Sequence, residues 1–252
     1  MNYEGMIAET VNIRGHDGDE VRAYAARPLG SGPFPGVVVL HHMPGWDDWS
    51  KEVVRKLAFY GYAAISPHLF HREAPGAAPD DAAAVARSQG GAPDDRIVGD
   101  AEGAADYLRS LPLANGNVGL IGFCSGGRQA YLLACRSTAF DAVVDCWGGR
   151  VIASEDQLTE RQPVAPFDLT ADMSAPLLGI FGNDDASPTP EDVDQTEEEL
   201  KRLGKTYEFH RYDDAGHGFF AVERPGYRPE QATDAWGKVF DWYERYLMKS
   251  GG

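Results

Sequence analysis

The chain has 252 residues, of which 43% are hydrophobic and 25% charged, a balance typical of a globular protein with a sizeable core. Its 39 acidic and 23 basic residues give a formal net charge of −16. Such an acidic surface argues against a nucleic acid or an anionic membrane as partner, because both require a basic footprint. We expect a single domain over residues 1–252, either monomeric or homodimeric.

Apolar runs and amphipathic runs alternate along the chain. The predicted strands cover residues 20–28, 36–42, 62–67, 117–123, 141–147, 176–182 and 206–213. The predicted helices cover residues 49–61, 80–89, 94–111, 125–137, 191–204 and 229–248, and a loop-rich insertion is expected near 148–174. This alternation predicts an α/β fold whose mostly parallel central sheet has helices on both faces. Ligands of such sheets bind at the carboxyl ends of the strands.

The three cysteines, Cys124, Cys135 and Cys146, follow no paired spacing. An odd number without such spacing favours a reduced, cytoplasmic protein over a disulfide framework. The N-terminal segment has no basic stretch followed by an apolar one, and no apolar run approaches about 18 residues. We therefore expect neither a signal peptide nor a membrane-spanning helix.

One glycine-rich turn lies between a predicted strand and a predicted helix, in the sequence GFCSGG (122–127). Its pattern is that of the nucleophile elbow, G-x-S-x-G, with Cys124 in place of serine. Such a strained turn projects its central residue above the sheet, and the following helix N-terminus favours a thiolate and a developing oxyanion. The alternative is a structural cysteine in a tight turn, and the motif alone does not decide. Cys135 and Cys146 are expected to be core residues.

Candidate partners of Cys124 follow two later strands, in the chain order nucleophile, acid, histidine. Asp184 and Asp185 come just after one predicted strand, and His217 lies between two glycines just after the next. A histidine in that setting is poorly explained as core filling, so we interpret His217 as the base. Asp185 has the G-x-x-D spacing from Gly182 that is usual for the acid. Asp184 would then cap a turn, and the reverse assignment stays open.

An oxyanion hole requires two N–H donors. One is expected from Ser125, directly after the candidate nucleophile. The second is expected from Met43, in the loop that follows the strand at 36–42.

Four histidines lie at or just after the ends of predicted strands in the first third of the chain. His41 and His42 resemble a metal pair, but adjacent strand residues point to opposite faces and no further ligand stands at suitable spacing. We therefore expect no metal and no cofactor. His68 and His71 are candidates for pocket lining.

The chain resembles the dienelactone hydrolase family, an α/β-hydrolase branch with a cysteine nucleophile. The resemblance runs from about residue 20 to the last predicted helix, and rests on GFCSGG, on GYAAISPHLFHREAPG (61–76), on the acid loop and on AGHGF (215–219). It implies that Cys124 is the nucleophile, Asp185 the acid and His217 the base. It also implies an oxyanion hole at Met43 and Ser125.

Two departures from the family pattern bear on the substrate. Family members usually carry a glutamate after the third strand, in contact with the thiol, where this chain has His42. It either stabilises a thiolate when protonated or only shapes the pocket. The family's carboxylate-bearing lactone is held partly by an arginine soon after the catalytic histidine, where this chain has Ala221, with Arg224 further on. Candidates for substrate contact are thus His42, Arg72 and Arg87.

The leading hypothesis is a hydrolase of a small lactone, ester or thioester that acts through a covalent thioester on the cysteine. One alternative is a non-catalytic ligand-binding or regulatory protein on the same fold, since fold does not fix function. Another is an acyltransferase that uses the same three residues.

Overall fold

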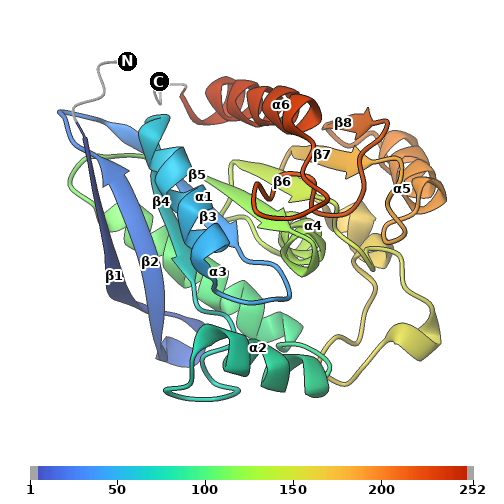
Figure 1. Cartoon of the computed structure of the whole chain (residues 1–252), viewed down its shortest axis with the longest axis horizontal. Coiled ribbons are helices and arrows are strands. Elements are labelled where there is room, and N and C mark those ends of the chain that lie inside the picture. The colour runs from blue at the N-terminus through green and yellow to red at the C-terminus, as the bar shows by residue number, and fades with distance from the viewer. Residues whose placement is uncertain (1–4, 249–252) are drawn as a thin grey trace.

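The computed structural model describes residues 5–248, and its strands form one eight-stranded sheet (Figure 1). The strands are β1 (Met6–Arg14), β2 (Glu20–Pro28), β3 (Phe34–Leu40), β4 (Ala63–Pro67), β5 (Ala114–Phe123), β6 (Ala142–Cys146), β7 (Leu177–Gly182) and β8 (Tyr207–Tyr212). Their order in the sheet is β1-β2-β4-β3-β5-β6-β7-β8. β2 pairs antiparallel with β1 and β4, and all other neighbours are parallel.

Helices cover both faces of this sheet (Figure 1). They are α1 (Asp48–Phe59), α2 (Pro79–Ser88), α3 (Asp94–Ser110), α4 (Ser125–Arg136), α5 (Pro190–Arg202) and α6 (Pro229–Leu247). α1 and α6 share one apolar core with one face of the sheet, and the other four helices contribute to the core on the opposite face. This arrangement confirms the predicted fold class. No helix among residues 5–248 combines the length and the apolar character needed to cross a membrane.

The predicted strands and helices all occur, with ends displaced by a few residues, but β1 was not predicted. Of its nine residues only Ile13 is buried. β1 pairs only with β2 at the sheet edge, so its sequence has none of the apolar run that marks the inner strands. β6 and β7, in contrast, are buried at every residue, and their apolar runs made them easy to recognise.

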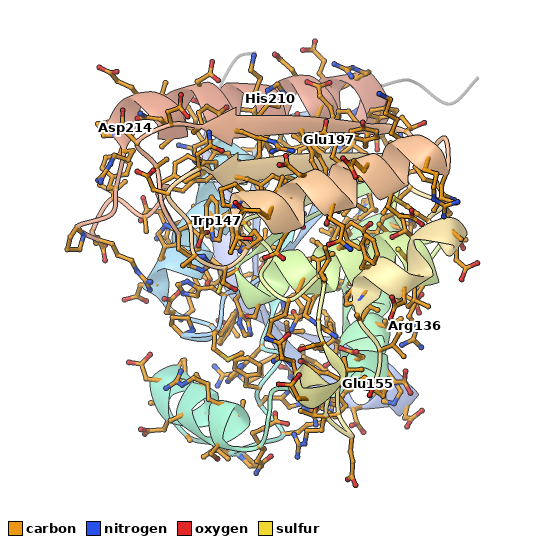
Figure 2. All side chains as sticks on the ribbon, turned by 90° about the vertical axis from the view of Figure 1, so that its right-hand side faces the viewer. Arg136, Trp147, Glu155, Glu197, His210 and Asp214 are labelled. Carbon is orange, nitrogen blue, oxygen red and sulfur yellow. The ribbon has the colours of Figure 1, made fainter. Side chains whose placement is uncertain are left out.

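The parallel strands place the segments of interest at one edge. The turns and loops after β3, β5, β6, β7 and β8 all leave the sheet at its carboxyl edge. The segment 148–174, expected to be rich in loops, follows β6 and contains two short 3-10 helices, Glu155–Gln157 and Pro166–Asp172. It lies on the side of the molecule that faces the viewer in Figure 2.

Candidate active site

Cys124 stands at the junction of β5 and α4 with a backbone that side chains rarely adopt, φ 57° and ψ −116°. The turn is tight because its neighbours are glycines. A Cβ added to Gly122 would collide with the Gly126 carbonyl oxygen, and one added to Gly126 would collide with the Leu40 carbonyl oxygen of β3. The G-x-C-x-G spacing is therefore what lets β5, α4 and β3 approach each other behind the cysteine.

The structure brings Cys124, Asp185 and His217 together. His217 Nδ1 lies 2.8 Å from Asp185 Oδ2, and the His217 side chain also hydrogen-bonds the Cys124 thiol. Asp185 is buried, and its other oxygen accepts the Ser187 N–H at 2.9 Å. Asp184 is exposed, and no hydrogen bond or ion pair joins its side chain to His217. The geometry therefore favours Asp185 as the carboxylate beside His217.

The electrostatics of this group favour a thiolate beside an imidazolium. Burial raises the pKa of Cys124, but the hydrogen bond and charge of His217 and the N–H groups of Met43 and Ser125 outweigh burial, so the pKa falls below its ordinary value. Burial lowers the pKa of His217, but the hydrogen bonds to Asp185 and Cys124 raise it to about 10. A proton is thus more stable on the imidazole than on the thiol.

The sulfur lies at the base of a cavity of about 480 Å³, within the usual size range of small-molecule sites. The lining consists of Met43, Cys124, Ser125, Arg128, Gly149, Arg150, Gln162, Asp185, Ala186, Ser187 and His217. The two residues predicted for the oxyanion hole thus face the same space as the thiol, and their N–H groups help to lower its pKa.

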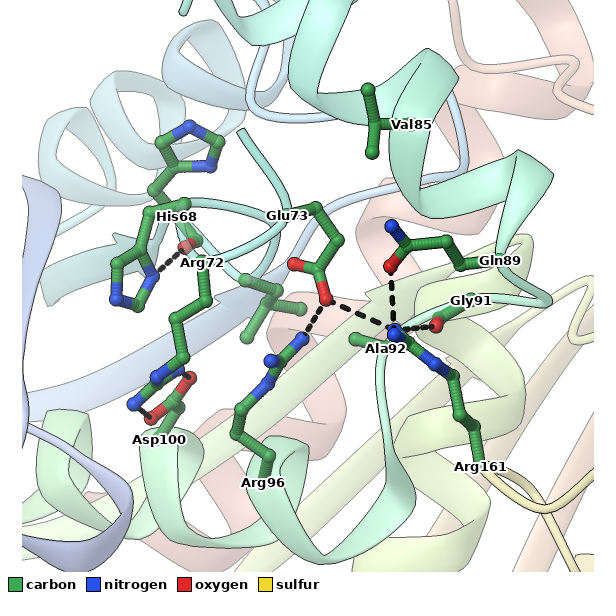
Figure 3. Close-up of polar contacts among 12 residues, drawn as sticks. His68, Arg72, Glu73, Val85, Gln89, Gly91, Ala92, Arg96, Asp100 and Arg161 are labelled. Atoms are coloured by element: carbon green, nitrogen blue, oxygen red, sulfur yellow. Dashed lines mark hydrogen bonds and ion pairs between the residues drawn. The ribbon is translucent and has the colours of Figure 1, made fainter. Parts of the chain in front are cut away.

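The three residues predicted to contact substrate, His42, Arg72 and Arg87, do not belong to this lining, and Arg72 is a clear correction. Its guanidinium lies 2.7 Å from Oδ2 of the buried Asp100 (Figure 3). It also lies 2.8 Å from Asp19 Oδ2. These pairs join Arg72, in the loop after β4, to α3 and to the turn between β1 and β2, and Arg72 does not line the cavity. Arg87 donates to the Met43 carbonyl oxygen at 3.3 Å, and so supports the Met43 loop without facing the cavity.

His42 is bound to the start of α1. Its Nε2 lies 2.6 Å from Asp47 Oδ2, and its ring packs on Trp49 at 5.0 Å between centroids. Asp47 caps α1 by accepting the Ser50 N–H at 2.9 Å. The groups that hydrogen-bond the thiol are His217, Met43 and Ser125, so His42 takes no part in that set.

The other early histidines have structural contacts. Leu69 N–H donates to His41 Nε2 at 3.2 Å, so Nδ1 carries the proton and donates to the His42 carbonyl oxygen at 2.9 Å. Burial lowers the pKa of His41 to about 3, which keeps it neutral. His68 stacks on Trp46 at 5.1 Å. Within residues 5–248, no cluster of three or more histidine, cysteine or acidic side chains has the arrangement of a metal site.

Sequence reasoning missed four polar residues of the lining: Ser187, beside the acid, and Arg128, Arg150 and Gln162. Arg128 is buried, and its guanidinium pairs with both oxygens of Asp94, at 2.7 and 3.1 Å. Arg150 is half-buried, has no carboxylate partner among the described residues, and leaves its Nε buried without a hydrogen bond. Arg128 could have been found, since it lies four residues after Cys124 on a predicted helix. Arg150 and Gln162 belong to the insertion, and its sequence has no helical or strand periodicity from which the course of its backbone could be predicted.

An ion cluster, formed by Glu73, Arg96 and Arg161, attaches this insertion to the rest of the domain (Figure 3). The buried Glu73 accepts from the guanidinium of Arg96 and, at 3.2 Å, from that of Arg161. The Arg161 carbonyl oxygen accepts the Asp94 N–H at 2.9 Å. Since Asp94 holds Arg128 and Gln162 follows Arg161, this Glu73 cluster fixes two of the polar lining residues, Arg128 and Gln162.

Comparisons with known proteins agree on one family. Residues 21–247 match the dienelactone hydrolase family. A protein of Methylorubrum extorquens named as a carboxymethylenebutenolidase is 34% identical over 250 residues, covering 96% of this chain and 82% of the relative. A Bradyrhizobium protein named as a 2-oxo-3-(5-oxofuran-2-ylidene)propanoate lactonase is 29% identical over 98% of both chains.

A solved structure gives the same result for the fold. The crystal structure of a dienelactone hydrolase from Klebsiella pneumoniae superposes with a TM-score of 0.85 at 29% identity, covering 96% of this chain and all of that one. The eight-stranded sheet is therefore that of the α/β-hydrolase fold.

Proposed function

The chain belongs to the dienelactone hydrolase family, and we propose that it hydrolyses small lactones and esters through a covalent thioester on Cys124. The observation that carries the proposal is that His217, held by Asp185, lines the same cavity as Cys124 together with Met43 and Ser125, and that these three residues lower the pKa of the thiol. A base and two donors around a nucleophile at an elbow are what acyl transfer to water requires.

The reaction follows from this arrangement. The Cys124 thiolate attacks the carbonyl carbon, and the charge that develops on the carbonyl oxygen is stabilised by the N–H groups of Met43 and Ser125. When the tetrahedral intermediate collapses, the C–O bond of the lactone breaks and the imidazolium of His217 gives its proton to the leaving oxygen. Water then attacks the thioester, His217 takes the proton from it, and the thiolate leaves. Asp185 orients the ring and stabilises its charged form throughout.

The substrate we propose carries an anionic group. The relatives named above act, by their names, on a carboxymethylene butenolide and on a propanoate lactone. The lining of this cavity offers Arg150, a guanidinium without a carboxylate partner among residues 5–248. Arg128 is already neutralised by Asp94. The Arg150 guanidinium donates to the Gln157 carbonyl oxygen, and a carboxylate of the substrate would supply the charged partner that it lacks.

Mass spectrometry of the acid-quenched enzyme tests the thioester. Wild-type protein mixed with 4-nitrophenyl acetate should carry one acetyl group on the peptide that contains Cys124. Cys135→Ala is the matched control, because burial raises the pKa of Cys135 to about 12 and makes that thiol unreactive. An acetyl group on any other residue, or turnover that survives Cys124→Ala, would refute the covalent role.

A matched pair of esters tests the anionic group. The KM of a 4-nitrophenyl monoester of succinic acid should rise about tenfold in Arg150→Met, the scale of losing a hydrogen-bonded charge. The KM of the neutral acetate should stay unchanged. Arg136→Met is the control, since Arg136 is a surface arginine paired with Asp95. Equal effects on both esters would exclude Arg150 as the anion contact.

A further inference from the structure

Asp145 is a buried carboxyl group that the proposed reaction does not use. It is 1% exposed and is the penultimate residue of β6. Its neighbours across the sheet are Gly122 of β5 and Gly179 of β7, which have no side chains to pack against it. No lysine, arginine or histidine within residues 5–248 forms an ion pair with it. Burying a carboxyl group without an ion pair lowers the stability of the fold, so the few contacts that Asp145 makes indicate its role.

The carboxyl lies between the start of α4 and the segment that follows β6. Its Oδ1 accepts the Gly148 N–H at 2.8 Å. A Cβ added to Gly127, in the first turn of α4, or to Gly148 would collide with that same oxygen. Asp145 therefore contacts the helix that begins directly after Cys124 and, on its other side, the segment Trp147–Arg150.

That segment reaches both the base and the substrate cavity. Trp147 and Arg150 have positive φ angles of 43° and 63°, so the segment does not hold its shape by backbone preference alone. The Trp147 ring lies 6.4 Å from the His217 ring in an edge-to-face arrangement. Gly149 and Arg150 line the cavity. The Trp147 side chain is buried, at 2% exposure.

We propose that Asp145 is a positioning residue: by accepting the Gly148 N–H beside α4, it fixes the Trp147–Arg150 segment and so directs Arg150 into the cavity. Asp145 itself does not belong to the lining of that cavity. The proposal rests on the proposed function, because it needs Arg150 to bind an anionic substrate.

The test compares variants that keep or lose the acceptor. Asp145→Val fills a buried strand position with a β-branched side chain that suits it and has no acceptor. Asp145→Ala removes more of the side chain, and Asp145→Asn keeps a carbonyl oxygen at the place of Oδ1. Valine and alanine should raise the KM of the anionic succinate ester about tenfold, as Arg150→Met does, while kcat and the KM of the neutral acetate change little. Asparagine should restore the wild-type KM.

The outcomes separate the two proposals. If the wild type hydrolyses neither ester, the proposed function fails. If it hydrolyses both and Asp145→Val binds the anionic ester like the wild type, the positioning role fails and the function stands. An asparagine variant as impaired as valine would also overturn the role, since hydrogen-bond acceptance would not be what Asp145 supplies. If Asp145→Ala does not fold, the comparison of Asp145→Val with Asp145→Asn still tests the positioning role.

Discussion

The two walls of the cavity are built in different ways. The wall that we propose to be catalytic, called the catalytic wall, is formed by Cys124, Asp185 and His217. It lies on the loops directly after β5, β7 and β8, within a few residues of each strand end. The binding wall, formed by Arg128, Arg150 and Gln162, depends on side chains from distant parts of the chain, above all Asp94 and the Glu73 cluster.

This difference indicates which parts of the sequence determine catalysis and which determine substrate binding. Strand ends in a parallel sheet fix the catalytic wall through backbone hydrogen bonds, so a change of a catalytic side chain should alter kcat and leave the fold intact. The binding wall depends on buried ion pairs, so changes in its supports should alter KM and stability together. The predictions below test that separation.

Cys124→Ala is expected to have the largest effect, abolishing turnover of the best substrate without change in the unfolding midpoint. The half-buried side chain contributes little to packing, and no other group can form the thioester. Cys124→Ser should be greatly impaired as well, because an alcohol needs a stronger base than a site built for a thiol supplies. Steady-state kinetics and urea unfolding measure both properties. Substantial residual turnover in Cys124→Ala would contradict the assignment.

His217→Ala and Asp185→Asn are expected to lower kcat on the order of a hundred-fold or more each, the usual scale of general acid–base catalysis. Alanine removes the base, and the amide disfavours the tautomer that Nδ1–Oδ2 contact requires. Asp184→Asn is the matched control and should be mild, since Asp184 is exposed. The reverse result for the two aspartates would move the acid to Asp184.

Asp145→Asn is expected to change how stability depends on pH. Burial raises the pKa of Asp145 to about 7, only partly offset by the Gly148 N–H, whereas an unfolded aspartate titrates near about 4. Because the pKa is higher in the folded state, the protonated carboxyl group stabilises the fold fully at pH values below about 4. This stabilisation is lost as the pH rises to about 7. Relative to the wild type, the asparagine variant should therefore gain about 2–3 kcal/mol of stability between pH 5 and pH 8. Urea unfolding of both proteins at the two pH values measures this, and parallel pH profiles would show that Asp145 does not titrate there.

Glu73→Gln is expected to weaken the binding wall. Losing the shared carboxylate leaves Arg96 and Arg161 without their ion pair, at a cost of about 2 kcal/mol, less than for a fully buried pair because Arg161 reaches solvent. The KM of the succinate ester should rise with kcat nearly unchanged. Arg136→Met, which breaks a surface pair, should cost less than about 1 kcal/mol. A fall in kcat without a change in KM would mean that the two walls are not separable.

His42→Gln is expected to have the smallest effect, on the alkylation of Cys124 by iodoacetamide. The lowered pKa of Cys124 means that its thiolate should persist below the ordinary thiol pKa and disappear only as pH falls further. Since His42 is bound to Asp47, the labelling profile should match that of the wild type. His217→Gln should shift the profile to higher pH. A shift in His42→Gln instead would restore the thiolate-stabilising role considered for His42.

The same contrast explains what the sequence could predict. The elbow, the acid loop and the loop at His217 were predictable, because each is a short polar or glycine-rich segment directly after an apolar strand. The structure places these residues together, and their catalytic roles remain predictions. Arg72 was assigned to the substrate wrongly, because nothing local to it shows that Asp100, on a helix 28 residues away, takes its guanidinium. Arg150 was missed for the same physical reason: long-range pairing decides which arginines lack a carboxylate partner.

The backbone of Cys124 has a consequence for the choice of nucleophile. Its φ of 57° with ψ of −116° is the mirror image of an extended conformation, which glycine adopts freely and every side chain adopts at a cost of about 1–3 kcal/mol. That cost arises at Cβ and is nearly the same whether the next atom is sulfur or oxygen. As far as backbone strain is concerned, cysteine and serine are equivalent at position 124, so the choice between sulfur and oxygen at this turn affects reactivity and not folding.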